Sequence, residues 1–308
     1  MKLFRLLLTL AATFGSLVFC AAATETPTAT NAATELPLLI EKIQAKLKTG
    51  VNSEADLAPE IAEFDVLLAR HKGEKTDEVA QILVMKAMLY VQVFENQEKG
   101  LVFLRQLKAE FPDTVPGKEV DRLIESIEAR AKAASIQTAL VGKPAPALHF
   151  TWSSRPGLKS LADLKGKVVV LDFWATWCGP CVRSFPQIAE VVSHYQGYDV
   201  EVIGVTSLQG RVSNLEAQPI DCKGDPAKET GLMPAFMKAK NMTWTVAFSA
   251  EEVFNPEYAI EGIPYMAILA PDGTIRHTGL HPAMPHAEKV EKIDAILKEF
   301  GLKVPAKS

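Results

Sequence analysis

The stretch from Val168 to Cys181 constrains the fold of this chain more than any other part of the sequence. It reads VVVLDFWATWCGPC, so a run of β-branched and apolar residues leads directly to two cysteines. The apolar run predicts a strand that is buried on both faces. We expect a helix from about Cys178 to Tyr195, and its first turn accommodates Pro180 because proline has no N–H to donate. The sequence therefore predicts a buried strand that delivers Cys178 to the start of a helix.

This placement has a chemical consequence for the two thiols. A cysteine at a helix N-terminus lies near unpaired backbone N–H groups and the positive end of the helix dipole, and both favour its thiolate. Cys178 is therefore the expected nucleophile, and Cys181, one turn further along, can resolve a mixed disulfide. The alternatives are a structural disulfide or half of a zinc site, but no second C-x-x-C and no H-x-x-H accompanies the pair.

The pentapeptide WCGPC at residues 177–181 resembles the active-site signature of the thioredoxin superfamily. The surrounding sequence is most similar to the exported TlpA/ResA-like thiol-disulfide oxidoreductases. Three further positions match the family. Asp172 stands where thioredoxins have a buried acid, Pro186 where they have a helix-kinking proline, and Gly262-Ile-Pro-Tyr265 where they have a cis-proline loop. The resemblance covers roughly Leu140 to the C-terminus. It implies a thioredoxin-like α/β fold, with a mixed central sheet and helices on both faces, preceded here by an all-α helical domain.

The resemblance gives Asp172 a catalytic role. In thioredoxins the matching acid deprotonates the resolving cysteine, which here is Cys181. Burial without a cationic partner raises the pKa of a carboxyl group, so that it exchanges protons near neutral pH. The family often has a lysine near this acid, and a rough alignment places Gly204 at that position. The alternative is a buried acid with a structural role only.

The resemblance also implies a set of substrate contacts. Pro264 is expected to follow a cis peptide bond beside Cys178, because cis bonds are rare except before proline. The backbone of the preceding residue would pair with an extended substrate, and a tyrosine replaces the threonine common in the next position. Trp174 is expected in the core. The predicted substrate-binding residues are Trp177, Gly179, Pro180, Ile263 and Tyr265.

The N-terminus has the pattern of a signal peptide over residues 1–23. A basic start is followed by an apolar run over residues 6–19 and a small-residue cleavage site that ends at Ala23. The run is short for a transmembrane span, so an uncleaved membrane anchor is the less favoured alternative. Lipidation at Cys20 is disfavoured because the bulky Phe19 precedes it. We therefore expect a periplasmic or otherwise exported protein.

The region between the leader and the catalytic domain is predicted to be helical. Residues 24–35 are rich in Thr, Ala and Asn and predict a flexible linker. Apolar residues at three- and four-residue spacing over residues 36–138 predict an all-α domain of about five helices. Residues 96–134 loosely resemble a tetratricopeptide helix pair, without a second copy at a fixed period. This domain either acts as a spacer or binds a partner protein, and His71 is expected to be a solvated helix cap.

Residues 139–308 form the predicted thioredoxin-like catalytic domain. After the active-site helix we expect a strand (200–205), a surface insertion (206–230), a helix (229–240), a strand (244–248), a hairpin (265–270 and 274–278) and a last helix (287–300). Cys222 lies in the insertion, where we expect a lone surface thiol or, alternatively, a third redox thiol.

The sequence predicts no cofactor and no bound metal, because the cysteine pair itself is the redox-active group. Copper is a minor alternative, because His277, His281, Met284 and His286 form a loose cluster of soft ligands. Copper-delivering relatives, however, usually space their cysteines C-x-x-x-C. The formal net charge of −4, without a block of Lys or Arg, does not favour nucleic acid as a partner.

The leading functional interpretation is an exported disulfide reductase. The Gly179-Pro180 dipeptide resembles that of reducing thioredoxins, whose potential is about −270 mV, against about −120 mV for the oxidant DsbA. The expected partners are a protein disulfide as substrate, a membrane thiol carrier as electron donor, and a protein bound by the helical domain. The alternatives are a disulfide-donating oxidase and a partner-binding scaffold with a redox-regulated thioredoxin domain. A peroxiredoxin-like activity would need P-x-x-x-T-x-x-C, which is missing before Cys178.

Overall fold

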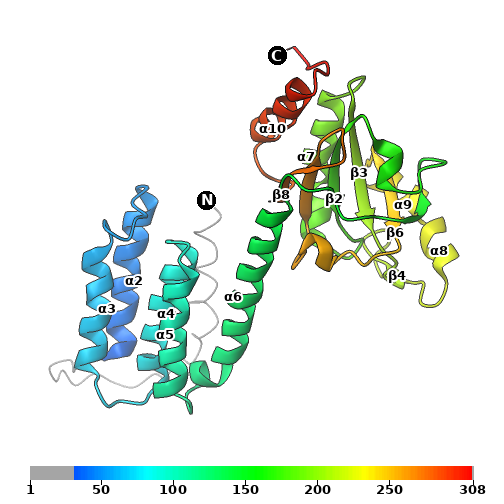
Figure 1. Ribbon diagram of the computed structural model, residues 1–308. Helices are drawn as coiled ribbons and strands as arrows, with labels where there is room; N and C mark the ends of the chain where they lie inside the picture. Colours follow the sequence, from blue (N-terminus) through cyan, green and yellow to red (C-terminus); the bar gives the residue numbers. More distant parts are fainter. Residues whose placement is uncertain (1–30, 307–308) are drawn as a thin grey trace. The chain divides into compact units, whose positions relative to one another are not determined.

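The computed structural model describes residues 31–306, which divide into two compact units with the boundary in sequence between Ala131 and Lys132. In the described residues, the first unit contains helices and no strand, as predicted, and its elements carry the labels of Figure 1. They are α2 (Ala32–Lys48), α3 (Ala58–Arg70), α4 (Asp77–Gln92), α5 (Gln97–Glu110) and α6 (Val115–Leu140), whose last turns belong to the second unit.

Helix α2 begins earlier than the sequence predicts. Residues 32–35, which were expected in the flexible linker, are helical because the Asn31 side chain accepts a hydrogen bond from the Ala33 N–H at 3.0 Å and so caps the helix. The prediction started the helix at the first apolar residue of the periodic pattern and overlooked this cap. The predicted signal peptide and residues 24–30 lie outside the described residues.

The core of the first unit is built around α4. This helix, which includes the fully enclosed Leu83, is buried over nearly its whole length, and Phe64 of α3 and Leu104 of α5 are fully enclosed in the same core. His71 also differs from its prediction as a solvated cap. It is 5% exposed, and its two ring nitrogens lie 3.1 Å from the carboxylates of Glu35 and Glu74. These hydrogen bonds raise the pKa of His71, with the one to Glu35 contributing most.

The second unit contains a mixed six-stranded sheet in the order β1-β6-β3-β2-β7-β8. Strand β2 lies parallel to β3 and antiparallel to β7, so the strand that leads to the cysteines is central. The strands are β1 (Phe150–Ser153), β2 (Val168–Phe173), β3 (Val200–Thr206), β6 (Thr245–Ser249), β7 (Tyr265–Leu269) and β8 (Ile275–Leu280). The predicted thioredoxin-like α/β fold with a mixed sheet is therefore confirmed.

Helical segments cover both faces of this sheet. One face packs against α7 (Gly179–His194), α9 (Met233–Ala239) and α10 (His286–Glu299), and this side holds the cysteines and Trp174. The opposite face is covered by shorter segments, including the 3₁₀ helices η1 (Leu161–Leu164) and η2 (Pro256–Tyr258). Helices α7 and α10 also pack against each other (Figure 1).

The region predicted as a surface insertion is partly folded into the unit. It contains a two-stranded hairpin of β4 (Arg211–Val212) and β5 (Ile220–Asp221), followed by α8 (Pro226–Gly231). Cys222 follows this hairpin and is 3% exposed, within the same apolar core as the active-site cysteines. The prediction of a surface thiol is therefore wrong, because the hairpin turns this residue inward.

Among residues 31–306, no helix has the length and apolar character that crossing a membrane requires.

Candidate active site

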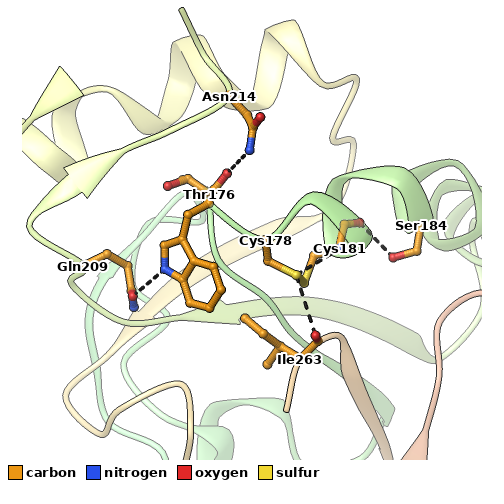
Figure 2. Close-up of a disulfide and its surroundings, with 8 residues drawn as sticks. Thr176, Cys178, Cys181, Ser184, Gln209, Asn214 and Ile263 are labelled. Atoms are coloured by element: carbon orange, nitrogen blue, oxygen red, sulfur yellow. Dashed lines mark hydrogen bonds between the residues drawn. A yellow bond between two sulfur atoms is a disulfide. The ribbon is translucent and has the colours of Figure 1, made fainter. Parts of the chain in front are cut away.

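The two cysteines lie at the start of α7 and form a disulfide (Figure 2). Cys178 is the N-cap residue, and the backbone N–H of Cys181 donates a hydrogen bond to its Sγ at 3.1 Å. The S–S distance is 2.03 Å, and the two residues are 3% and 1% exposed. Pro180 lies in the first turn of the helix. The predicted placement of the cysteine pair between a buried strand and a helix is thus confirmed.

The start of α7 favours negative charge on Cys178 once the disulfide is reduced. The Cys181 N–H already faces the Cys178 sulfur, and the helix dipole adds a positive potential there. Cys181 lies one turn deeper and is almost completely enclosed. This geometry supports attack by Cys178 and resolution by Cys181.

A loop with a cis peptide bond lies directly beside the attacking sulfur. The Ile263–Pro264 bond is cis, as the resemblance predicts, and the Ile263 carbonyl oxygen lies 3.8 Å from Cys178 Sγ (Figure 2). In the disulfide form this sulfur carries no proton, so the contact is one of proximity and not a hydrogen bond. Ile263 is half-buried next to the disulfide. Pairing of its backbone with a substrate stays a prediction.

Trp177, directly before Cys178 in the sequence, forms an apolar surface with Phe254. Its half-buried ring stacks on Phe254, with centroids 6.2 Å apart, and the Phe254 side chain is 41% exposed. Of the two residues between the cysteines, Gly179 is half-buried and Pro180 is exposed. Phe254 was not predicted, because it lies in a loop that no motif marks.

The insertion holds the Trp177 ring in place. The indole N–H donates a hydrogen bond to Gln209 Oε1 at 2.8 Å (Figure 2). The buried carboxylate of Glu229 accepts hydrogen bonds from the backbone N–H groups of Gln209 and Gly210, each at 2.8 Å. Sequence reasoning missed this support, because the residues involved are separated along the chain and belong to no known motif.

Replacing Glu229 with glutamine should destabilise the protein and loosen Trp177. The amide group would present an N–H to one of the two backbone N–H donors and leave it unpaired, at a cost of about 1–3 kcal/mol. Urea denaturation measures this cost, and the anisotropy of Trp177 fluorescence, isolated by comparison with a Trp177→Phe variant, reports the loosening. Glu216→Gln, at an exposed position in the same insertion, is the matched control. Equal stability of the two variants would contradict the assigned role of Glu229.

The Tyr265 side chain does not lie at the substrate-binding surface where the sequence predicts it. This side chain is 5% exposed, and its ring lies 5.7 Å from that of Phe173 in an edge-on arrangement. The hydroxyl donates to the Tyr258 carbonyl oxygen at 3.3 Å. Because the side chain packs in the core on the sheet face opposite the disulfide, the predicted contact of Tyr265 with substrate is wrong for its ring.

Asp172 lies on β2 in an enclosed position, and Val170 and Trp174, two residues away on either side, pack in the same core as the cysteines. Asp172 is 1% exposed, and neither carboxylate oxygen has a hydrogen-bond partner within residues 31–306. Burial raises the pKa of Asp172 to about 7, and the charge of Lys289 opposes that rise. A carboxyl group with this pKa can both release and accept a proton near neutral pH, which supports the predicted proton-carrying role.

Two tryptophans fill the space beside Gly204. Gly204 on β3 is in register with Asp172, and a Cβ added there would lie 2.9 Å from Trp244 Nε1 and 3.0 Å from Trp174 Nε1. The two indoles therefore leave no room for a side chain, and a lysine at this strand position is excluded. Trp174 is fully buried, as predicted.

The positive charge that acts on Asp172 lies on a different element. Lys289 on α10 is 0% exposed, and its Nζ donates to the carbonyl oxygens of Pro282 at 2.7 Å and Gln187 at 3.1 Å. Helix α10 packs against both β2 and α7, and the charges of Lys289 and Asp172 act on each other. Burial lowers the pKa of Lys289, and the negative charges of Glu190 and Asp172 oppose this.

The four residues considered for copper lie over β8, the loop after it and the first turn of α10. His286 is close to α7, where its ring is 5.3 Å from that of His194 and its Nδ1 is 3.9 Å from Glu190. In the described part of the chain, no three His, Cys, Asp or Glu side chains come together in a way that could hold a metal ion.

Known proteins resemble this chain over its second unit. The sequence model of the Redoxin family matches residues 140–297, just over half of the chain. The thiol-disulfide oxidoreductase ResA of Bacillus subtilis (strain 168) is 26% identical over 115 residues, which are 37% of this chain and 54% of that protein. ResA of Bacillus thuringiensis subsp. konkukian is 35% identical over 104 residues, 30% of this chain and 59% of that protein. The chain thus spans about half the length of the curated relatives it matches.

Among solved structures, a thiol-disulfide isomerase from Corynebacterium glutamicum is 20% identical, with a TM-score of 0.39, and the match covers 51% of this chain and 97% of that one. The Redoxin match includes the whole sheet, the disulfide and most of α10. The chain therefore belongs to the Redoxin family.

Proposed function

We propose that this protein is a thiol-disulfide oxidoreductase that reduces disulfides in exported proteins. The observation that carries the proposal is the Cys178–Cys181 disulfide at the N-terminus of α7, with the carbonyl oxygen of Ile263 3.8 Å from Cys178 Sγ. The relatives whose names read thiol-disulfide oxidoreductase support the same chemistry.

The proposed reaction has three steps in which atoms and electrons balance. A dithiol donor first gives two electrons and two protons to the Cys178–Cys181 disulfide. The Cys178 thiolate then attacks a substrate disulfide, forming a mixed disulfide and releasing one substrate thiolate, which takes up a proton. Finally Cys181, as a thiolate, attacks Cys178 Sγ, which restores the Cys178–Cys181 disulfide and releases the second substrate thiolate. The net change moves two electrons and two protons from the donor to the substrate disulfide.

Asp172 serves the last step in this scheme. Cys181 is buried, so its proton must pass to a group inside the protein before it can attack. Asp172 has no hydrogen-bond partner among the described residues, and its pKa of about 7 allows it to accept this proton at neutral pH. The proton then leaves to solvent after the product has gone.

The reducing direction rests on the Gly179-Pro180 dipeptide between the cysteines. Two assays run side by side test it. The protein, kept reduced by dithiothreitol, should speed the reduction of insulin disulfides, and the oxidised protein should transfer its disulfide poorly to a reduced, unfolded protein. If the oxidised protein instead transfers its disulfide faster than the reduced protein reduces insulin, the disulfide-donating alternative is supported.

The location and partners of the protein form a second part of the proposal. The leader over residues 1–23 supports export to the periplasm or an equivalent compartment, where a membrane thiol carrier would supply electrons. The helical unit would bind a partner protein. Mass spectrometry of the N-terminus after export tests the first point, and cleavage near Ala23 is the expected result.

A further inference from the structure

The helical unit contains an apolar groove that the proposed redox chemistry does not use. It has a volume of about 740 Å³ and is lined by α2, α4, α5 and α6. Its floor includes Leu36, Val84 and Met85, which are almost fully buried, while Val115 at its edge is 47% exposed. The volume lies within the range of about 300–1,000 Å³ that is usual for ligand sites. The groove is therefore large enough to bind a ligand and open enough to admit one.

The charged residues along this groove are all acidic. Glu41, Asp77, Glu78 and Glu119 line it, and no Lys, Arg or His is among the lining residues. Within residues 31–306, the carboxylates of Glu41 and Glu78 form no hydrogen bond and no ion pair, whereas the Glu119 carboxylate is paired with Arg122 at 3.0 Å. Asp77 differs, because its Oδ1 accepts a hydrogen bond from the Val115 N–H at 2.8 Å.

This combination selects one class of occupant. An apolar floor between helices suits the apolar face of an amphipathic helix, which inserts side chains spaced at i, i+3, i+4 and i+7. The acidic edge attracts Lys and Arg on the flanks of that helix, and it repels anionic lipid and nucleic acid. Met85 in the floor adds a flexible side chain that adapts to different apolar anchors.

We propose that this groove binds a cationic amphipathic helix of a partner protein. The inference deepens the proposed partner role of the helical unit and rests on it. It does not depend on the redox activity, so binding and disulfide reduction can succeed or fail separately.

A synthetic peptide tests the proposal on the full chain. The probe is a fluorescently labelled helix of about 18 residues with leucine at i, i+3, i+4 and i+7 and lysine on its other face, and the control peptide carries glutamate instead of lysine. Fluorescence anisotropy should show binding of the lysine peptide at least about tenfold tighter than that of the glutamate peptide, with the difference shrinking as salt is added. Equal binding of the two peptides, or no binding of either, would overturn the proposal.

Charge reversal at the edge locates the site. Glu41 and Glu78 are exposed, so the double variant Glu41→Lys/Glu78→Lys should fold normally, bind the lysine peptide about tenfold more weakly and bind the glutamate peptide more tightly. The matched control is Glu98→Lys/Glu125→Lys, which changes the net charge equally at exposed positions outside the groove. An equal effect of the control variant would show that only overall charge matters and would refute the site. Insulin reduction by both variants should stay unchanged.

Discussion

Replacing Cys178 with serine should abolish disulfide reduction, lowering its rate by at least about 10³-fold, because no other thiol at the site can begin the exchange. Cys181→Ser should behave differently. It retains the attacking thiol beside the Ile263 carbonyl but lacks the thiol that releases the product. This variant should therefore accumulate a mixed disulfide between Cys178 and the substrate. Insulin reduction measures the rate, and intact-mass spectrometry detects the trapped adduct.

Cys222→Ser is the matched control for both variants. Cys222 is a free thiol in the core and is 3% exposed, so it should take no part in the exchange. The variant should keep activity within about twofold of the parent protein, since removing a bystander thiol leaves the reacting sulfurs unchanged. Substantial activity in Cys178→Ser, or a trapped adduct on Cys222, would contradict the assignment of Cys178 as the nucleophile.

The second large effect concerns Asp172 and the pH dependence of stability. Its pKa is about 7 in the folded protein, against an ordinary value of 3.8. Between these values the unfolded chain releases the proton while the folded chain keeps it, so the folded state binds more protons and its stability falls as pH rises. This pKa difference corresponds to about 4 kcal/mol of folding stability. The protein loses that stability between about pH 4 and pH 7, and the contribution of Asp172 does not change at higher pH.

Asp172→Asn removes this titration. Urea denaturation of the oxidised proteins at pH 4 and pH 8 should show that the parent protein loses about 4 kcal/mol more stability over this range than the variant does. The comparison between two pH values cancels the constant cost of burying an amide. The same variant should resolve mixed disulfides about 10²-fold more slowly, because it lacks the internal proton acceptor. An equal change in the free energy of unfolding between pH 4 and pH 8 for the two proteins would contradict the raised pKa of Asp172.

Lys289→Met should raise the pKa of Asp172 further. The buried ammonium group favours the charged carboxylate, so its removal makes the proton harder to release. A ¹³C NMR titration of the Asp172 carboxyl carbon in the oxidised protein measures this directly, and it is insensitive to any loss of stability from the unpaired carbonyl groups of Gln187 and Pro282. Lys298→Met, exposed on the same helix, should leave the titration unchanged. An unchanged Asp172 titration in Lys289→Met would contradict the charge interaction.

The part of the active site built from residues close together in the sequence was predicted correctly. The apolar run before Asp172 gave the correct strand, and its end at Phe173 placed Cys178 at the cap of α7. The Ile263–Pro264 loop is far away in sequence, but it was found because proline at this place in the family pattern is distinctive.

Residues that reach the site from distant elements were missed. Lys289 lies on the last helix and has no fixed spacing from Asp172, so no periodic pattern could connect them. A rough alignment placed Gly204 where the family often has a lysine, but only the packing of two indoles explains why no side chain fits there. Gln209 and Phe254 contact Trp177 through folded loops, and loop conformation is not encoded in a short motif.

Burial of polar groups was also hard to predict. His71 looked like a solvated helix end, yet two carboxylates enclose it, one of them from α2. Cys222 looked like a surface thiol because its neighbours are polar, yet a short hairpin turns it into the core. In both cases the environment depends on tertiary contacts that composition alone does not reveal.

The reduction potential of the Cys178–Cys181 pair tests the central claim most directly. The full chain is equilibrated with glutathione and dithiothreitol buffers, and the fraction of disulfide is read by thiol trapping and mass spectrometry. A reversible two-electron couple near or below the thioredoxin value of about −270 mV is the predicted result. A value near that of DsbA, about −120 mV, or the absence of a reversible two-electron couple, would contradict the account.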